Sequence, residues 1–139
     1  MSSFKTTMTG YIGYRGKEGH LSFLLHRITG LGTALFLTIH ILDTATVYFF
    51  PQLYEHAIAL YRTTIFGIGE IGLIFSVLFH GVNGLRIAFM DLVAPHLWTE
   101  PRERTSTRFT LIVTLILWLP ATAVMLYNIL HHNYGLFGG

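Results

Sequence analysis

Three histidines lie inside long apolar stretches of the sequence, where an imidazole needs a partner. They are His26, His40 and His80, and the whole chain contains eight histidines but no cysteine. Polar groups in hydrocarbon are costly, so they usually face a neighbouring helix, a cofactor or water. Because cysteine is absent, disulfides, iron–sulfur clusters and thiolate-bound haem or zinc are excluded within this sequence. Histidine is therefore the candidate ligand if the chain binds a metal.

The spacing around His80 suits haem. Arg86 follows His80 by six residues, which corresponds to about 9 Å along a helix. Haem carries its iron at the centre and two propionates at one edge, and arginine binds carboxylates well. An imidazole ligand with a cation about one haem radius nearer the membrane surface would therefore suit both the iron and the propionates.

Polar side chains line the first apolar stretch at spacings of three and four, which place most of them on one side of a helix. His26 and His40 are two heptads apart and nearly share this side, although about 21 Å separates them in depth. Helix packing is the alternative explanation, because an intramembrane histidine can donate a hydrogen bond between helices and small residues allow close helix contact. Arg27 and Arg86 could likewise be anchors at the membrane surface.

The elements that would hold these residues are three membrane-spanning helices. The chain has 139 residues, of which 52% are hydrophobic and only 12% charged, and its mean hydropathy is +0.54. Soluble domains are about one-quarter charged. Apolar blocks at about 21–50, 65–93 and 109–127 each offer the roughly 20 residues that cross about 30 Å of hydrocarbon. The sequence therefore predicts an all-α integral membrane protein.

Prolines and polar segments delimit the predicted helices. Pro51 lacks an N–H group and should end the first helix, and residues 52–62 have the pattern of a short amphipathic helix at the membrane surface. Pro120 lies inside the third block and predicts a kink there. We expect spanning helices at about 21–50, 64–93 and 106–131. The third is interpreted as structural because its polar residues are few: Thr110, Thr114, Trp118 and Thr122.

The basic residues predict the orientation, because they accumulate on the cytoplasmic side of membrane proteins. Arg62 alone falls at the other end of the spans. The rest lie near the start of the first helix or around the loop between the second and third: Lys5, Arg15, Lys17, Arg27, Arg86, Arg102, Arg104 and Arg108. We expect the N-terminus in the cytoplasm, or in the mitochondrial matrix for an organelle protein, and the C-terminus outside. Residues 1–20 lack the apolar core of a signal peptide, and a net charge of +2 suggests no nucleic-acid partner.

Two strings give the sequence a resemblance to a known family. Residues 22–30 read SFLLHRITG, and residues 80–91 read HGVNGLRIAFMD. Together with three spans and a short polar N-terminus, they resemble the cytochrome b membrane-anchor subunit of succinate dehydrogenase, the succinate:quinone oxidoreductase of respiratory complex II. The likeness covers order and topology from about residue 20 to the end, and it implies a single membrane-anchor domain over residues 1–139.

The resemblance implies roles for individual residues. His80 matches an axial ligand of haem b, whose second axial histidine usually comes from the partner anchor subunit. Arg27 matches an arginine near the haem propionates and the quinone, and His26 matches its neighbouring histidine. The quinone-site serine of some members precedes the histidine by three residues, whereas Ser22 precedes His26 by four. The implied cofactor-binding residues are His80, His40, His26, Arg27 and Arg86, and the implied quinone-binding residues are Ser22, His26 and Arg27.

His40 bears on the number of haems that the resemblance implies. Some related anchors hold two haems stacked across the membrane, and His40 would then bind the iron of the distal one. The alternative role of His40 is a hydrogen bond to Asp43 or to a partner helix. We therefore expect one or two haem b groups, with His80 and His40 as the candidate iron ligands.

The implied function is that of a non-catalytic subunit of an oxidoreductase complex in the cell inner (cytoplasmic) membrane. Flavoprotein and iron–sulfur subunits would oxidise succinate and pass electrons to quinone beside this chain and a second anchor subunit. The sequence leaves two alternatives. One is a haem-free anchor of the same complex, which a reduced-minus-oxidised difference spectrum would distinguish. The other is a small proton-conducting membrane protein that uses Asp43, Glu70 and the histidines.

Overall fold

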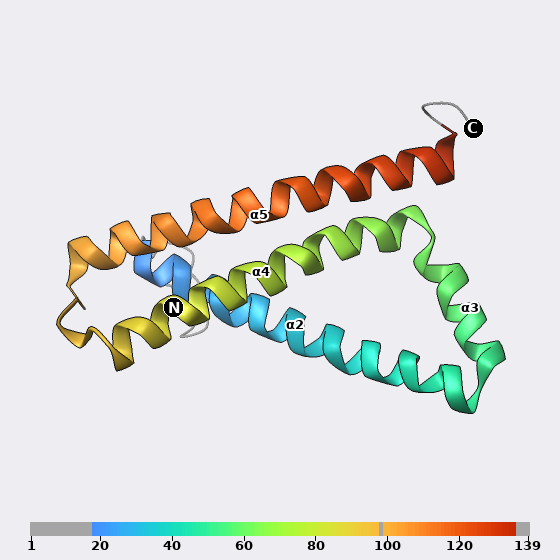
Figure 1. Ribbon diagram of the computed structural model, residues 1–139, viewed down its shortest axis with the longest axis horizontal. Coiled ribbons are helices and arrows are strands. Elements are labelled where there is room, and N and C mark those ends of the chain that lie inside the picture. The colour runs from blue at the N-terminus through green and yellow to red at the C-terminus, as the bar shows by residue number, and fades with distance from the viewer. Residues whose placement is uncertain (1–17, 98, 136–139) are drawn as a thin grey trace, which may run out of the picture.

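The computed structural model describes residues 18–97 and 99–135, and this part of the chain is helical apart from short connections (Figure 1). Its elements in chain order are α2 (Glu18–Phe49), α3 (Pro51–Tyr61), α4 (Thr64–Leu92), the 3-10 turn η1 (Pro95–Leu97) and α5 (Glu100–Tyr134). Three helices are long and apolar enough to cross a membrane, over Gly19–Phe49, Thr64–Leu92 and Pro101–Tyr134. The predicted all-α membrane fold, with a short helix between the first two spans, is confirmed. Lys5, Arg15 and Lys17, on which the predicted orientation partly rests, lie outside the described residues.

The helix boundaries follow from local sequence. Pro51 occupies the first turn of α3, where its missing N–H group is not needed, so α2 ends at Phe49. Pro101 likewise occupies the first turn of α5, which begins at Glu100. This start is earlier than the expected position near residue 106. Gly135 ends α5 in the left-handed conformation (φ 62°), which glycine adopts without steric cost. The helix α5 continues through Pro120 without a break.

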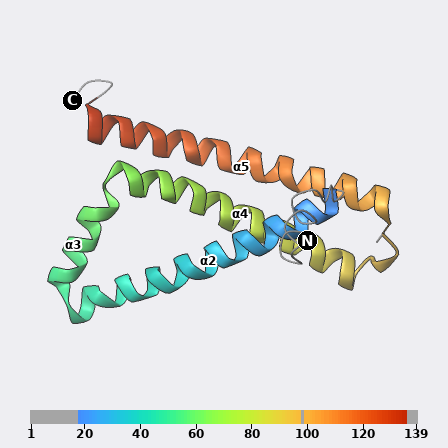
Figure 2. The ribbon, with the colours of Figure 1, turned by 180° about the vertical axis from the view of Figure 1, so that it is seen from behind.

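The helix α4 lies at the centre of the arrangement. It packs against α2 on one side and against α5 on the other, whereas α2 and α5 touch much less. Figures 1 and 2 show α2 and α4 crossing near the beginning of α2 and separating toward α3, which closes the wider end. The backbones of α2 and α4 are therefore closest at the crossing and farthest apart where α3 connects them.

The interior of this small bundle is more polar than its surface. The buried apolar side chains among the described residues are Phe79, Met90 and Ala94. Most of the large apolar side chains are exposed, as expected for surfaces that face lipid or partner helices. Several threonine hydroxyls inside the spans donate to carbonyls one turn earlier, as Thr33 does to Thr29 at 2.8 Å, which satisfies the hydroxyl within its own helix.

The contact between α4 and α5 holds α4 in place through packing and hydrogen bonds. Thr110 and Thr114 of α5 are buried. The indole N–H of Trp118 donates to the Ile71 carbonyl oxygen of α4 at 2.9 Å, and the Trp118 ring meets the Phe75 ring edge-on at 5.6 Å between centroids. These contacts agree with the interpretation of the third span as structural.

Candidate functional site

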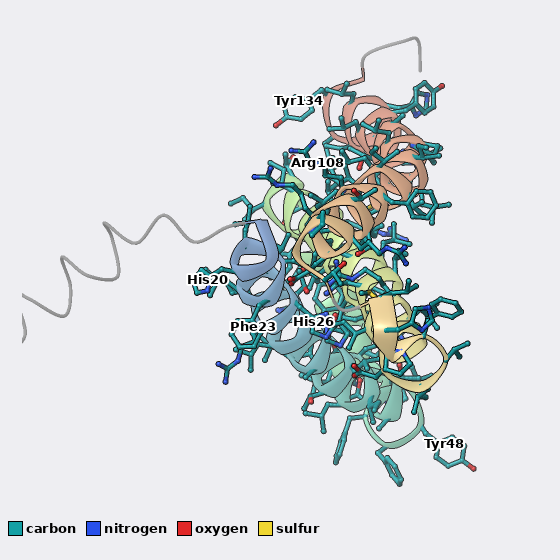
Figure 3. All side chains as sticks on the ribbon, turned by 90° about the vertical axis from the view of Figure 1, so that its left-hand side faces the viewer. His20, Phe23, His26, Tyr48, Arg108 and Tyr134 are labelled. Atoms are coloured by element: carbon teal, nitrogen blue, oxygen red, sulfur yellow. The ribbon has the colours of Figure 1, made fainter. Side chains whose placement is uncertain are left out.

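The crossing of α2 and α4 gathers most of the polar residues that the sequence singles out. Ser22, His26 and Gly30 lie one turn apart on α2, and they meet His80 and Asn83 of α4. In Figure 3, His26 points toward the interior of the bundle, whereas His20 and Phe23 of the same helix point outward. Spacings of three and four residues on both helices therefore bring two polar strips face to face.

The rings of His26 and His80 stack on each other. Their centroids are 4.1 Å apart and their planes differ by 6°. The Nδ1 atom of His80 lies 3.1 Å from the backbone carbonyl oxygen of His26. Because a carbonyl oxygen only accepts hydrogen bonds, this contact requires a proton on Nδ1 and leaves the lone pair of neutral His80 on Nε2. Metal-binding histidines are commonly oriented in this way.

Glycines allow the two helices to approach closely enough for this stack. A Cβ atom added to Gly30 would lie 2.8 Å from Cε1 of His80 and 3.1 Å from its Nδ1 atom. A Cβ atom added to Gly84 would lie 3.8 Å from Cε1 of His26, which is ordinary van der Waals contact. Gly30 is thus the position where any side chain would displace the His80 imidazole.

Ser22 and Asn83 form a second contact across the same crossing. The Ser22 hydroxyl donates to Oδ1 of Asn83 at 3.2 Å, and the two residues are 3% and 0% exposed. Asn83 was not among the predicted site residues. Its position three residues after His80, on the same side of α4, was the available signal.

Polar atoms without hydrogen-bond partners are concentrated near this crossing. Of the four such buried side-chain atoms in the described part of the chain, three are His26 Nδ1, Asn83 Nδ2 and Arg86 Nε, and the fourth is Thr122 Oγ1. Buried polar atoms normally have partners, so each orphan requires an explanation. A cluster of three along two facing helices is the pattern expected where a bound group supplies the missing partners.

The two arginines predicted near the haem behave differently. Arg86 is half-buried, and its Nη1 atom donates to the hydroxyls of Ser106 (3.4 Å) and Thr107 on α5. Arg27 is exposed, with its guanidinium carbon 5.2 Å from the centroid of the Phe23 ring. The fold therefore brings together Ser22, His26 and His80, fixes Arg86 two turns beyond His80, and leaves Arg27 on the outer surface of α2.

His40 lies in a different place, toward the end of the bundle where α3 connects α2 and α4. Its ring stacks on Phe36 at 5.5 Å between centroids. It lines a cavity of about 530 Å³ between α2, α3 and α4, together with Asp43, Tyr61 and Glu70. The Tyr61 hydroxyl donates to the Asp43 carboxylate. This hydrogen bond raises the pKa of Tyr61 above its ordinary value, helped by partial burial and by the negative charges of Asp43 and Glu70.

Within residues 18–97 and 99–135, no group of three or more His, Asp or Glu side chains is placed to hold a metal ion. The crossing instead presents one oriented imidazole and, two turns further along α4, one arginine. On each face of a haem, the iron binds one axial ligand from the protein. The negatively charged propionates are stabilised by nearby cations. The donor set at the crossing therefore fits a haem face.

Comparisons with known proteins place the chain in a family. Residues 13–121 match the family of succinate dehydrogenase/fumarate reductase transmembrane subunits. The chain is also similar to the succinate dehydrogenase 2 membrane subunit SdhC of Mycobacterium tuberculosis (strain ATCC 25618 / H37Rv). The two are 38% identical over 121 residues, which cover 86% of this chain and 85% of the relative. The family match includes the whole of α2 and α4, and so the whole crossing.

Proposed function

Because the chain belongs to the succinate dehydrogenase/fumarate reductase transmembrane subunit family, we propose that it is a cytochrome b anchor that holds haem b at His80. In this proposal it also helps to form the quinone site. A flavoprotein subunit oxidises succinate, an iron–sulfur subunit carries the electrons to the membrane, and a second anchor subunit contributes the other axial histidine. The chain performs no bond chemistry itself, and its residues bind and orient.

The orientation of His80 carries the proposal. The 3.1 Å contact between its Nδ1 atom and the His26 carbonyl oxygen fixes the plane of the ring and directs the lone pair to Nε2. Bound haem would supply reversible one-electron storage beside the quinone. The protein controls its potential through the basicity of His80, the cations near the propionates and the dryness of the site.

Arg86 is suited to bind a haem propionate. Its Nη1 atom is held by the α5 hydroxyls of Ser106 and Thr107, which orients the guanidinium. Its Nε atom is buried without a partner. A carboxylate that accepts from Nε would remove this unsatisfied donor, and arginine suits the task because its charge persists at any physiological pH. Arg27 is the proposed second cation, on the surface of α2 that a partner subunit would cover.

The proposed quinone site consists of Ser22, His26 and Arg27 at the same end of α2. Ser22 is already tied to Asn83, but Nδ1 of His26 has no partner, and the Arg27 guanidinium is exposed. Donors of this kind hydrogen-bond a quinone carbonyl and favour the reduced, more negative form of the molecule. We therefore propose that electrons enter the membrane at the end of the bundle that carries most of the arginines.

Replacing Arg27 with leucine should slow quinone reduction by about 10- to 100-fold, the rate equivalent of a charge-assisted hydrogen bond of about 1.5–3 kcal/mol. Reduction of an artificial dye by succinate, which bypasses the membrane site, should change little. The two activities are measured on the same purified complex, with Arg102→Leu as a control for removing one surface charge. Equal loss of both activities in Arg27→Leu would exclude the quinone role.

We propose a single haem, bound at His80 and not at His40. The charged side chains that line the cavity beside His40 are the carboxylates Asp43 and Glu70, which would repel the propionates of a second haem. The end of the bundle that carries His80 instead has Arg27 and Arg86, which would attract the propionates. The complex should therefore contain one haem per flavin, and His40→Ala should leave this ratio unchanged. A ratio of two that falls to one in His40→Ala would show that His40 holds a distal haem.

The proposed orientation places the His80 end toward the cytoplasm and the C-terminus outside. Arg27, Arg86 and the arginines at the start of α5 lie at one end of the bundle, whereas Arg62 lies at the other. This asymmetry follows the positive-inside rule. It also brings the proposed quinone site to the face at which soluble subunits would dock.

A further inference from the structure

A second polar cavity lies at the opposite end of the bundle from His80. It has a volume of about 580 Å³ and lies between the α3–α4 junction and the last turns of α5. Figure 1 shows these segments close together at the end where the C-terminus lies. Its polar lining comes from both segments and consists of Tyr61, Arg62, Thr63, Glu70, Asn128, His132 and Asn133.

The two segments are tied together by their own hydrogen bonds. The Asn133 amide nitrogen donates to the Arg62 carbonyl oxygen at 3.2 Å and to the Thr64 hydroxyl at 3.0 Å. The Thr64 hydroxyl in turn lies 3.4 Å from the Tyr134 hydroxyl. The cavity therefore has a fixed frame between residues about 70 positions apart in the sequence.

Asn133 is used within this frame, but other donors that line the cavity are not. Only the backbone of Arg62 takes part in it, and in the described part of the chain the Arg62 guanidinium has no hydrogen-bond or salt-bridge partner. The Nδ1 atom of His132 donates to the Asn128 carbonyl oxygen at 3.2 Å. Its Nε2 atom is therefore left to bind another group. A permanent cation, an imidazole and the side-chain amide of Asn128 together match an anion that has several oxygen atoms.

The position of the cavity indicates the class of anion. One candidate membrane span begins at Thr64 and another ends at Tyr134, so the cavity lies at the ends of two spans, where lipid headgroups are expected. Its lining also includes apolar or small residues, namely Gly67, Met125 and Ile129. A molecule with a polar anionic head and an adjoining apolar part matches both linings.

We propose that this cavity binds the phosphodiester headgroup of an anionic phospholipid, with Arg62 as the principal contact and His132 and Asn128 as further donors. Glu70 also lines the cavity, and its carboxylate favours the singly charged phosphodiester over the doubly charged inorganic phosphate. The bound lipid would join the α3–α4 junction to the end of α5. This site does not depend on haem or quinone.

The test is titration of the purified, delipidated complex with phosphatidylglycerol, followed by native mass spectrometry of the first bound lipid. Arg62→Gln should weaken this binding about fivefold, the ratio equivalent to about 1 kcal/mol for one basic residue near a membrane surface. Arg102→Gln, which removes a cation at the other end of the bundle, should leave it unchanged. Glu70→Gln should strengthen it, because the repelling charge is gone.

Three results would overturn the proposal. The first is unchanged affinity in Arg62→Gln while circular dichroism shows an intact fold. The second is an equal loss of affinity in Arg62→Gln and Arg102→Gln, because that would indicate general surface charge rather than a site. The third is displacement of the lipid by millimolar inorganic phosphate, which would indicate a site for a free anion.

Discussion

Replacing His80 with alanine should abolish the haem absorbance of the complex while the chain still inserts in the membrane. The proposed axial bond comes from Nε2 of this residue, and its Nδ1 atom is already committed to the His26 carbonyl oxygen. The neighbouring imidazole of His26 is stacked on the His80 ring and so does not occupy the position of Nε2 of His80. The measurement is the reduced-minus-oxidised difference spectrum and the haem-to-flavin ratio of the purified complex.

The control for this experiment is His56→Ala. His56 is exposed on the short helix α3, away from the crossing, so its loss should leave the spectrum and the ratio unchanged. Retention of the wild-type spectrum in His80→Ala would exclude His80 as an iron ligand. The histidine would then be a helix-packing residue, as the sequence alone also allowed.

The second large effect is expected at Gly30, which has no side chain and would not bind the iron itself. An alanine there would place its Cβ atom 2.8 Å from Cε1 of His80, so the imidazole or the helix must move. Overpacking of this kind costs about 1–3 kcal/mol. Because the displaced group is the proposed ligand, Gly30→Ala should lower the haem content and shift the midpoint potential of the haem that remains.

Gly32 provides a matched control two residues further along α2. A Cβ atom added to Gly32 would lie 3.5 Å from the Ser76 hydroxyl oxygen, which is ordinary contact. Gly32→Ala should therefore leave both haem content and midpoint potential close to wild type. If the two alanine variants behave alike, the close contact between Gly30 and His80 does not position a ligand.

The spans could be predicted from the sequence because they depend on properties that one chain segment carries by itself. Runs of apolar residues determine which segments enter the membrane, and Pro51 sets a helix boundary by lacking an N–H group. The earlier start of α5 shows the limit of this reasoning. Residues 100–105 are polar and do not extend the apolar run, but Pro101 begins a helix that continues beyond the hydrocarbon.

The site could be predicted only in part, because helical spacing tells which residues share a side of a helix but not which helices meet. The spacing grouped Ser22 with His26 and separated His40 from them in depth. The stack of His26 on His80 depends on the crossing of α2 and α4, which a single sequence does not specify. The contact between Ser22 and Asn83 depends on the same crossing.

The two arginines show the same limit. Both follow a histidine in their strings, Arg27 by one residue and Arg86 by six. Arg86 finds hydroxyl partners on α5, whose register against α4 could not be derived from spacing. Arg27 is exposed and lies over Phe23 rather than in the crossing. A role for Arg27 in the complex therefore requires a surface supplied by another subunit.

The most direct measurement is an experimental density map of the assembled complex in a lipid bilayer. We expect a porphyrin whose iron is bonded to Nε2 of His80, with the Nδ1 atom of the same ring still donating to the His26 carbonyl oxygen and a propionate at Arg86. A map in which His80 only packs against neighbouring helices, with no porphyrin beside it, would contradict it.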